Sequence, residues 1–218
     1  MFVKICANTN LEDALLAAEL GADAAGFVFA ESKRKVNAEQ VAAITPHLPA
    51  SVAKVGVFTS TDACEILLAA KTAGLTAVQL HSDFNPELID AVHADGLKIF
   101  QVIDVPEDAS LADLEAALCT ALAHPYIEAA LLDASHGGAS GGTGKTFDWS
   151  ATAEMVRRVA DETGGKVIVA GGLCAENVGE AINAFQPWGV DVASGVEAFP
   201  GRKDAAKLKE FIAVARAR

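Results

Sequence analysis

Two side chains that could exchange protons with a substrate end buried segments far apart in the sequence. Cys6 lies at the expected strand end within the apolar segment 3–7, and Asp133 ends the apolar segment 129–133. A cysteine with a lowered pKa can act as a base, and a carboxyl group in apolar surroundings can act as a general acid. Facing one cavity, the two would form an acid–base pair. A buried structural cysteine and a helix-capping aspartate are the alternative interpretations.

A buried ion pair is expected beneath Cys6. Lys4 lies two positions before Cys6, so in a strand both side chains point to the same face. A buried ammonium needs a partner of opposite charge. Asp191 lies within the apolar segment 190–194 and would supply it if the first and last strands are neighbours. We expect a Lys4–Asp191 pair whose positive member favours the Cys6 thiolate.

Two glycine-bearing turns follow the last two apolar segments. Gly171–Gly172 comes after segment 167–170, and Ser194–Gly195 comes at the end of segment 190–194. Either pair alone is typical of a tight turn. Together, at the ends of neighbouring strands, they indicate backbone N–H groups that bind phosphate.

Two further side chains could contact a substrate. His81 ends the segment 77–81, and Arg34 lies in the loop 32–34, where a guanidinium could bind a carboxylate. A structural histidine and a solvated basic loop are the alternatives. The five histidines have no ligand spacing with each other or with the cysteines, so we expect no metal site.

The segment 137–145 reads GGASGGTGK and resembles a nucleotide-binding loop only superficially. The phosphate-binding pattern requires glycine five positions before Gly144, where this chain has Ala139. The next helix is expected to begin near Ser150, too late for its N-terminus to face a phosphate. A loop that closes over a substrate is the better interpretation.

Short apolar segments alternate with alanine-rich amphipathic segments along the whole chain. We expect strands at 3–7, 25–29, 52–58, 77–81, 97–102, 129–133, 167–170 and 190–194. We expect helices at 11–20, 38–45, 61–73, 86–94, 111–122, 150–162, 175–184 and 204–215. Nearly continuous apolar strands are typical of parallel sheets buried on both faces.

Eight strand–helix units without a linker predict a single α/β domain over residues 1–218, a (β/α)₈ TIM barrel with eight parallel strands. An open doubly wound sheet is the alternative, but segment 7–10 lacks the usual glycine fingerprint after the first strand. In a barrel the carboxyl ends of all strands meet at one mouth, which would bring the candidate side chains together.

Composition limits the partners. The 218 residues are 51% hydrophobic, which excludes intrinsic disorder, and carry a net charge of −12. Because an acidic surface repels nucleic acid and anionic membranes, we expect neither as a partner. The four cysteines form no CxxC pair, which favours reduced thiols. No signal peptide or membrane span is visible, so we expect a cytoplasmic protein.

The ordered set of segments resembles the phosphoribosylanthranilate isomerases of tryptophan biosynthesis. The resemblance runs from the first strand to the last helix. It is carried by 4–6 (KIC), 26–29 (GFVF), 32–34 (SKR), 55–58 (VGVF), 78–81 (VQLH), 141–149 (GGTGKTFDW) and 191–197 (DVASGVE).

The resemblance implies a (β/α)₈ barrel that performs an Amadori rearrangement without a cofactor. Asp133 would be the general acid that protonates the ribose ring oxygen, and Cys6 the general base that takes the C2′ proton. Arg34 would face the anthranilate carboxylate, and the two glycine-bearing turns would hold the phosphate. The ligand would be a small phosphoribosyl compound, bound by a monomer or a homodimer. The expected substrate-binding residues are therefore Arg34, His81, Gly171, Gly172, Asp191, Ser194 and Gly195.

The chain departs from the family pattern at two positions. Ala7 follows the cysteine and Ser82 follows the strand-four histidine, where the family usually has glycine. Glycine allows positive φ at low cost, whereas a residue with a Cβ does not. Either the backbone keeps a negative φ at these positions, or it is strained by about 1–3 kcal/mol.

Two other functions stay open at this point. The related phosphoribosyl-aminoimidazole-carboxamide isomerase of the histidine pathway runs the same chemistry on a larger substrate with two phosphates. Its sites resemble a carboxylate pair, and it needs a second phosphate site. Cys6 and the single set of glycine-bearing turns count against it. A non-catalytic phosphosugar-binding barrel would be consistent with the changes at Ala7 and Ser82, but the retained Cys6 and Asp133 count against it.

Overall fold

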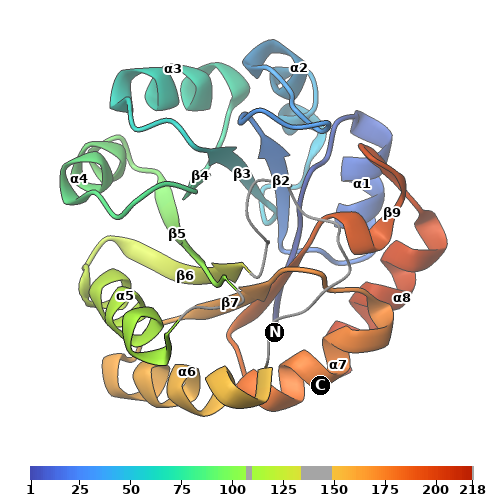
Figure 1. Ribbon diagram of the computed structural model, residues 1–218. Coiled ribbons are helices and arrows are strands. Elements are labelled where there is room, and N and C mark those ends of the chain that lie inside the picture. Colours follow the sequence, from blue (N-terminus) through green and yellow to red (C-terminus); the bar gives the residue numbers. More distant parts are fainter. Residues whose placement is uncertain (107–109, 134–148, 218) are drawn as a thin grey trace.

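The chain forms a closed barrel of eight parallel strands surrounded by helices, as predicted (Figure 1). This computed structural model describes residues 1–106, 110–133 and 149–217. The barrel strands pair in chain order, and β1 closes the barrel against β8. They are β1 (Phe2–Ile5), β2 (Ala24–Val28), β3 (Ala53–Phe58), β4 (Ala77–Leu80), β5 (Lys98–Asp104), β6 (Ile127–Asp133), β7 (Val167–Ala170) and β8 (Gly189–Val192).

Helices follow the strands around the outside of the barrel (Figure 1). They are α1 (Leu11–Glu19), α2 (Ala38–Ala42), α3 (Ala63–Ala73), α4 (Pro86–Ala94), α5 (Leu111–Ala123), α6 (Trp149–Thr163), α7 (Ala175–Phe185) and α8 (Ala205–Arg216). Capping side chains set several of their starts. Asn10 and Asn37, for example, accept hydrogen bonds from the backbone of the first turn of α1 and α2. No helix in the described part of the chain is long and apolar enough to cross a membrane.

The structure corrects the predicted elements at several places, and the strand expected at 3–7 ends at Ile5. The helix expected at 38–45 ends at Ala42 and is followed by a 3₁₀ helix, η1 (Thr45–His47), because Pro46 has no N–H to continue an α-helix. The strand expected at 190–194 ends at Val192. It is followed by a 3₁₀ helix, η2 (Ser194–Val196), and by an unpredicted antiparallel hairpin of β9 (Glu197–Phe199) and β10 (Arg202–Lys203).

Alternation along the strands divides the core into two layers. Inward side chains from alternate positions fill the barrel with a cluster of Ala24, Val55, Ala77, Phe100, Val102, Ala129, Leu131, Ile168 and Ala170. The intervening residues, such as Val3 and Ile5 of β1, belong to the clusters that pack strands against helices. On β1 the even-numbered side chains therefore point into the barrel. Lys4 lies in the barrel interior, and Cys6, directly after the strand, continues the same alternation.

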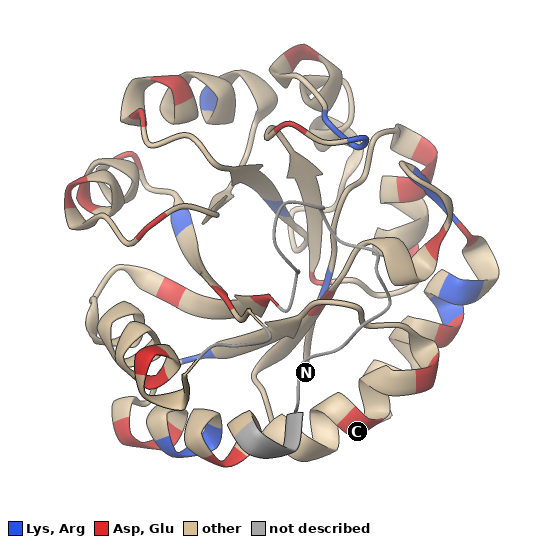
Figure 2. Cartoon of the chain, in the orientation of Figure 1, with Lys and Arg blue, Asp and Glu red and all other residues tan. Residues whose placement is uncertain are grey.

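Charge is distributed unevenly between the outside and the inside. In Figure 2 acidic residues are coloured on most of the outer helices, in agreement with the net charge of −12. The charged residues that the barrel buries include several cations, among them Lys4, Arg34 and Lys203. Buried carboxylates pair with these three cations.

Candidate active site

Strand ends bring the predicted catalytic residues to one mouth. Cys6 directly follows β1, His81 directly follows β4, and Asp133 is the last residue of β6. Because all eight strands are parallel members of one closed barrel, these carboxyl ends lie at the same face. Asp133 is close enough to His81 that its charge contributes to the raised pKa of that imidazole.

The predicted ion pair between the first and last strands is confirmed. Lys4 and Asp191 are register partners across β1 and β8, and Lys4 Nζ lies 2.9 Å from Asp191 Oδ1. The Lys4 side chain is fully buried. Burial disfavours its charged form, but the Asp191 carboxylate and Cys6 outweigh this, so the pKa of Lys4 is raised. Lys4 therefore stays a cation inside the barrel.

The Cys6 side chain lies against the bare backbone of a glycine. A Cβ on Gly26 would meet Cys6 Sγ at 2.8 Å and Lys4 Nζ at 3.2 Å, so the thiol and the ammonium both occupy the space that this glycine leaves. Burial raises the pKa of the Cys6 thiol, and the Lys4 charge lowers it only in part. The expected direction of the Lys4 effect is right, but the expectation that Cys6 has a lowered pKa is wrong, because burial outweighs the lysine.

The backbone beside Cys6 is strained. Ala7 has a φ of +62°, in the left-handed region that favours glycine, and its side chain is buried. Of the two alternatives for this position, the strained one applies. Ser82 keeps a φ outside that region, and its buried hydroxyl has no hydrogen-bond partner in the described part of the protein. The two departures from the family glycines therefore have different structural consequences.

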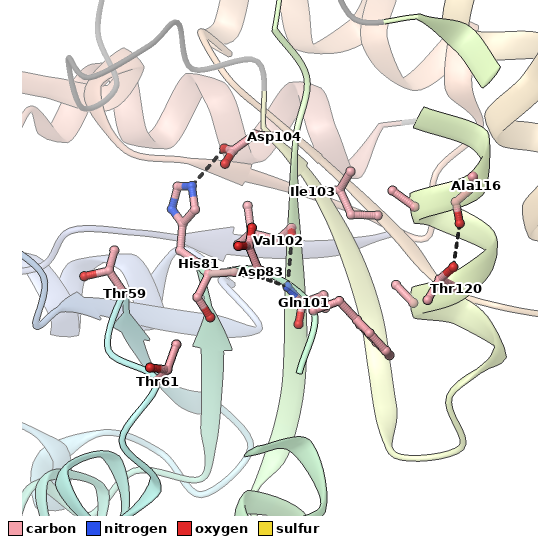
Figure 3. A pocket seen from close by; sticks show the side chains of 14 residues that line it. Thr59, Thr61, His81, Asp83, Gln101, Val102, Ile103, Asp104, Ala116 and Thr120 are labelled. Carbon is pink, nitrogen blue, oxygen red and sulfur yellow. Dashed lines mark hydrogen bonds and ion pairs between the residues drawn. The ribbon is translucent and has the colours of Figure 1, made fainter. Parts of the chain in front are cut away.

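His81 pairs with an aspartate that the sequence did not single out. His81 Nε2 lies 2.8 Å from Asp104 Oδ1, and Figure 3 shows the two side chains pointing toward each other beside a cavity of about 800 Å³. The hydrogen bond to Asp104 is the main cause of the raised pKa of His81. The predicted strand stopped at 102, but β5 runs to Asp104. Its inward alternation through Phe100 and Val102 is the signal that could have identified Asp104.

Arg34 is buried rather than solvated. Its Nε and Nη2 atoms donate to the carboxylate of Glu197 in β9, with the shortest contact 2.7 Å between Nη2 and Oε2. This two-pronged geometry fixes the plane of the guanidinium. Glu197 was not predicted as a site residue, because it lies in the hairpin that the sequence pattern did not reveal.

The two glycine-bearing turns lie against each other. Gly171 and Gly172 have φ values of +88° and +64°, and Asn177 of α7 donates to Gly172 O at 3.0 Å. A Cβ on Gly195 would lie 1.8 Å from Leu173 O, so only glycine lets η2 approach the turn after β7 this closely. The first turns of η2 and α7 thus meet at one place, as a phosphate site requires.

Two predictions concern metals and the glycine-rich loop. Within residues 1–106, 110–133 and 149–217, no group of three potential ligands could hold a metal ion. The segment 137–145, expected to close over the substrate, lies outside the described residues.

Comparison with known proteins identifies the family. The family described as N-(5′-phosphoribosyl)anthranilate (PRA) isomerase matches residues 3–214. The chain belongs to this family. A curated relative named N-(5′-phosphoribosyl)anthranilate isomerase, from Geobacter sulfurreducens, is 44% identical over 211 residues, which cover 96% of each chain.

Solved structures of phosphoribosylanthranilate isomerases have the same architecture. The enzyme from Thermotoga maritima aligns with a TM-score of 0.86 at 39% identity over the whole of both chains. Another structure, in complex with reduced 1-(o-carboxyphenylamino)-1-deoxyribulose 5-phosphate, aligns with a TM-score of 0.83 at 38% identity, again over all of both chains.

Proposed function

We propose that this chain converts N-(5′-phosphoribosyl)anthranilate to 1-(o-carboxyphenylamino)-1-deoxyribulose 5-phosphate in tryptophan biosynthesis, with Asp133 as general acid and Cys6 as general base. The observation that carries the assignment is the position of Cys6 directly over the buried Lys4–Asp191 pair, at the same mouth as Asp133. Membership of the isomerase family supports the reaction, and the geometry supports the division of roles.

The reaction needs one acid and one base and no external oxidant. Asp133 donates a proton to the ribose ring oxygen, and the bond from that oxygen to C1′ breaks to leave a protonated Schiff base. Cys6 then removes the C2′ proton, and the electrons of that bond move to form an enolamine. The enolamine tautomerises to the ketone, so C1′ is reduced as C2′ is oxidised.

A raised pKa of the Cys6 thiol is compatible with this role. Burial raises the pKa of Cys6, whereas Lys4 lowers it. The Schiff base formed in the first step carries a positive charge, which makes the C2′ proton more acidic and stabilises a nearby thiolate. Cys6 therefore becomes an effective base only after Asp133 has acted.

Substrate binding is assigned to the remaining residues of the mouth. Backbone N–H groups at Gly171–Gly172 and Ser194–Gly195 would hold the phosphate at the first turns of η2 and α7. Arg34 would face the anthranilate carboxylate, and His81, whose pKa is raised, would add positive charge. Asp191 would act indirectly, through its ion pair with Lys4 inside the barrel. These groups oppose the acidic background field, which would otherwise repel an anionic substrate.

The same proposal places the reaction in the cytoplasm, where the four free cysteines would stay reduced. The protein would act as a monomer or a homodimer, without nucleic acid or membrane partners.

The test follows the decay of anthranilate fluorescence during turnover of freshly made phosphoribosylanthranilate. We expect rapid decay with the wild type and a loss of at least about 10²-fold in kcat for Cys6→Ala and for Asp133→Ala. Cys64→Ala, at an exposed cysteine, is the matched control and should behave as the wild type. Folded wild type without turnover would overturn the reaction. Turnover of the two-phosphate phosphoribosyl-aminoimidazole-carboxamide substrate instead would favour the histidine-pathway reaction. Full activity of either catalytic variant would overturn the assigned roles.

A further inference from the structure

The β9–β10 hairpin delivers a buried ammonium to the place where β1 meets β8. The Lys203 side chain is fully buried, and its Nζ donates to Cys6 O at 2.6 Å and to Ala193 O at 3.0 Å. Cys6 carries the thiol of the site, and Ala193 immediately precedes η2. None of the roles assigned above uses Lys203.

These two carbonyl groups lie just beyond the point where the hydrogen bonds between β1 and β8 end. The last hydrogen bond between the two strands runs from Cys6 N to Val192 O at 2.8 Å. Beyond it the chains diverge, because Ala7 turns with φ +62° and Ser194 begins η2. Lys203 pairs both carbonyls and so extends the junction of β1 and β8 by one step. It thereby fixes the Cys6 backbone relative to the turn that begins η2.

Glu197 extends the same chain of contacts to Arg34. Its Oε1 lies 3.6 Å from Lys203 Nζ, and Arg34 donates to both of its carboxylate oxygens. Gly201 N donates to Oε1 at 3.2 Å, which holds the carboxylate within its own hairpin. The three groups thus connect the loop after β2 to the junction of β1 and β8.

The balance of buried charge in this network favours an anion. A third buried carboxylate, Asp13, accepts from Lys203 N but is paired with Arg202. Lys4, Arg34 and Lys203 therefore share two carboxylates, Asp191 and Glu197, which leaves one positive charge in excess. A thiolate at Cys6 or an anionic substrate would neutralise it. Burial lowers the pKa of Lys203 itself, against the opposing effect of the Glu197 carboxylate. In its charged form Lys203 acts to lower the pKa of the Cys6 thiol.

We propose that Lys203 is a positioning residue for the isomerisation, which holds the Cys6 base in register with the turn that begins η2, and that Glu197 connects this ammonium to Arg34. The inference rests on the proposed function. Lys203 does not touch the reacting atoms, and it acts through the backbone of Cys6 and Ala193.

Lys203→Met tests the proposal against Lys207→Met. Lys207, in α8, donates to the backbone oxygen of Glu197 at 3.0 Å and contacts the same hairpin without reaching Cys6 or Ala193. We expect Lys203→Met to lower kcat by about 10²-fold, the usual consequence of displacing a reacting group by about 1 Å, and to raise KM as η2 shifts. Lys207→Met should stay within about twofold of the wild type.

The pH dependence of Cys6 alkylation gives a readout that a purely structural role would not move. Iodoacetamide modification is followed at the Cys6 peptide by mass spectrometry, which separates it from the other cysteines. The midpoint should move to higher pH in Lys203→Met and stay unchanged in Lys207→Met, because only the first variant removes a charge that favours the thiolate. A folded Lys203→Met protein with wild-type kcat, KM and midpoint would overturn the proposal.

If Lys203→Met yields no folded protein, the variant Glu197→Gln tests the proposal instead. Its amide still accepts from Arg34 but loses both charge pairs, so KM should rise by about tenfold while kcat is largely retained. An unchanged KM would overturn the proposal. Failure of the proposed function is distinguishable, because it is seen as absent turnover in the wild type, whereas the alkylation midpoints still report the coupling of Lys203 to Cys6.

Discussion

Lys4 Nζ contacts Asp191 Oδ1 at 2.9 Å where the first strand closes the barrel against the last. The pair lies inside the barrel, next to the Cys6 thiol. Separately, each charge would be costly to bury, and together they satisfy one another. The contact therefore has two consequences, one for stability and one for the chemistry above it.

Asp191→Asn should destabilise the fold, because it leaves the Lys4 ammonium buried without a counter-charge. We expect the free energy of unfolding in urea to fall by about 3–5 kcal/mol at pH 7. The double variant Lys4→Met/Asp191→Leu should lose less, since no charge is left unpaired. Because the folded pKa of Lys4 is raised, the pair's contribution is fully present below about pH 10 and is lost as pH rises through the folded value. Equal losses for the single and double variants would contradict this account.

Gly26→Ala should impair catalysis more than folding. The new Cβ would lie 2.8 Å from Cys6 Sγ and 3.1 Å from Cys6 Cα, so Cys6, the proposed base, must move. We expect kcat to fall by about 10²-fold. Gly189→Ala is the matched control, since its Cβ would be equally crowded, 2.8 Å from Phe2 O, at the opposite end of the barrel. It should lower thermal stability and leave kcat nearly unchanged, and a similar kcat loss in both variants would count against the assignment of Cys6.

Ala7→Gly should raise stability slightly. A left-handed φ costs a residue with a Cβ about 1–2 kcal/mol, part of which is offset by the extra entropy of glycine in the unfolded chain. We expect the free energy of unfolding to rise by less than about 1 kcal/mol. Gly164→Ala provides the reverse change at nearly the same φ, +64°, with no atom within 4 Å of the new Cβ, and should cost about 1 kcal/mol. Changes of the same sign in the two variants would refute the strain at Ala7.

Asp104→Asn should lower the pKa of His81, because it removes the carboxylate that stabilises the imidazolium. The midpoint is measured from the His81 ring resonances by NMR, with Asp83→Asn, at an exposed neighbour, as control. In the wild type the stabilising contribution is fully present below the unfolded pKa of histidine, about 6.5, and is lost as pH rises through the raised folded value. An unchanged His81 midpoint in Asp104→Asn would rule out the pairing in solution.

Local sequence patterns predicted the eight strand–helix units, since each strand is a run of buried residues bounded by turn residues. Strand alternation together with barrel closure also predicted the Lys4–Asp191 pair. The pattern could not reveal β9 and β10, because strands of three and two residues are too short to show a period. Lys203 consequently looked like any charged residue of a surface loop.

The pKa of Cys6 could not be predicted from the sequence for a different reason. The sequence identified its cationic neighbour, but the pKa also depends on how much water the fold removes, and burial outweighs Lys4. At Ala7 the sequence left two backbone conformations, and only the path of the chain between Cys6 and Asn8 decides between them. Both outcomes depend on contacts between distant segments.

The contact between β1 and β8 also limits when the barrel can close during synthesis of the chain on the ribosome. Lys4 emerges from the ribosome 187 residues before Asp191, and Lys203 emerges later still. Until then β1 has an unpaired edge and a cation without its counter-ion, so a nascent chain cannot complete the barrel from its N-terminal portion. Closure through such distant contacts makes folding slow and leaves intermediates exposed to chaperones and proteases. The full set of contacts around Cys6 therefore forms only when synthesis is nearly finished.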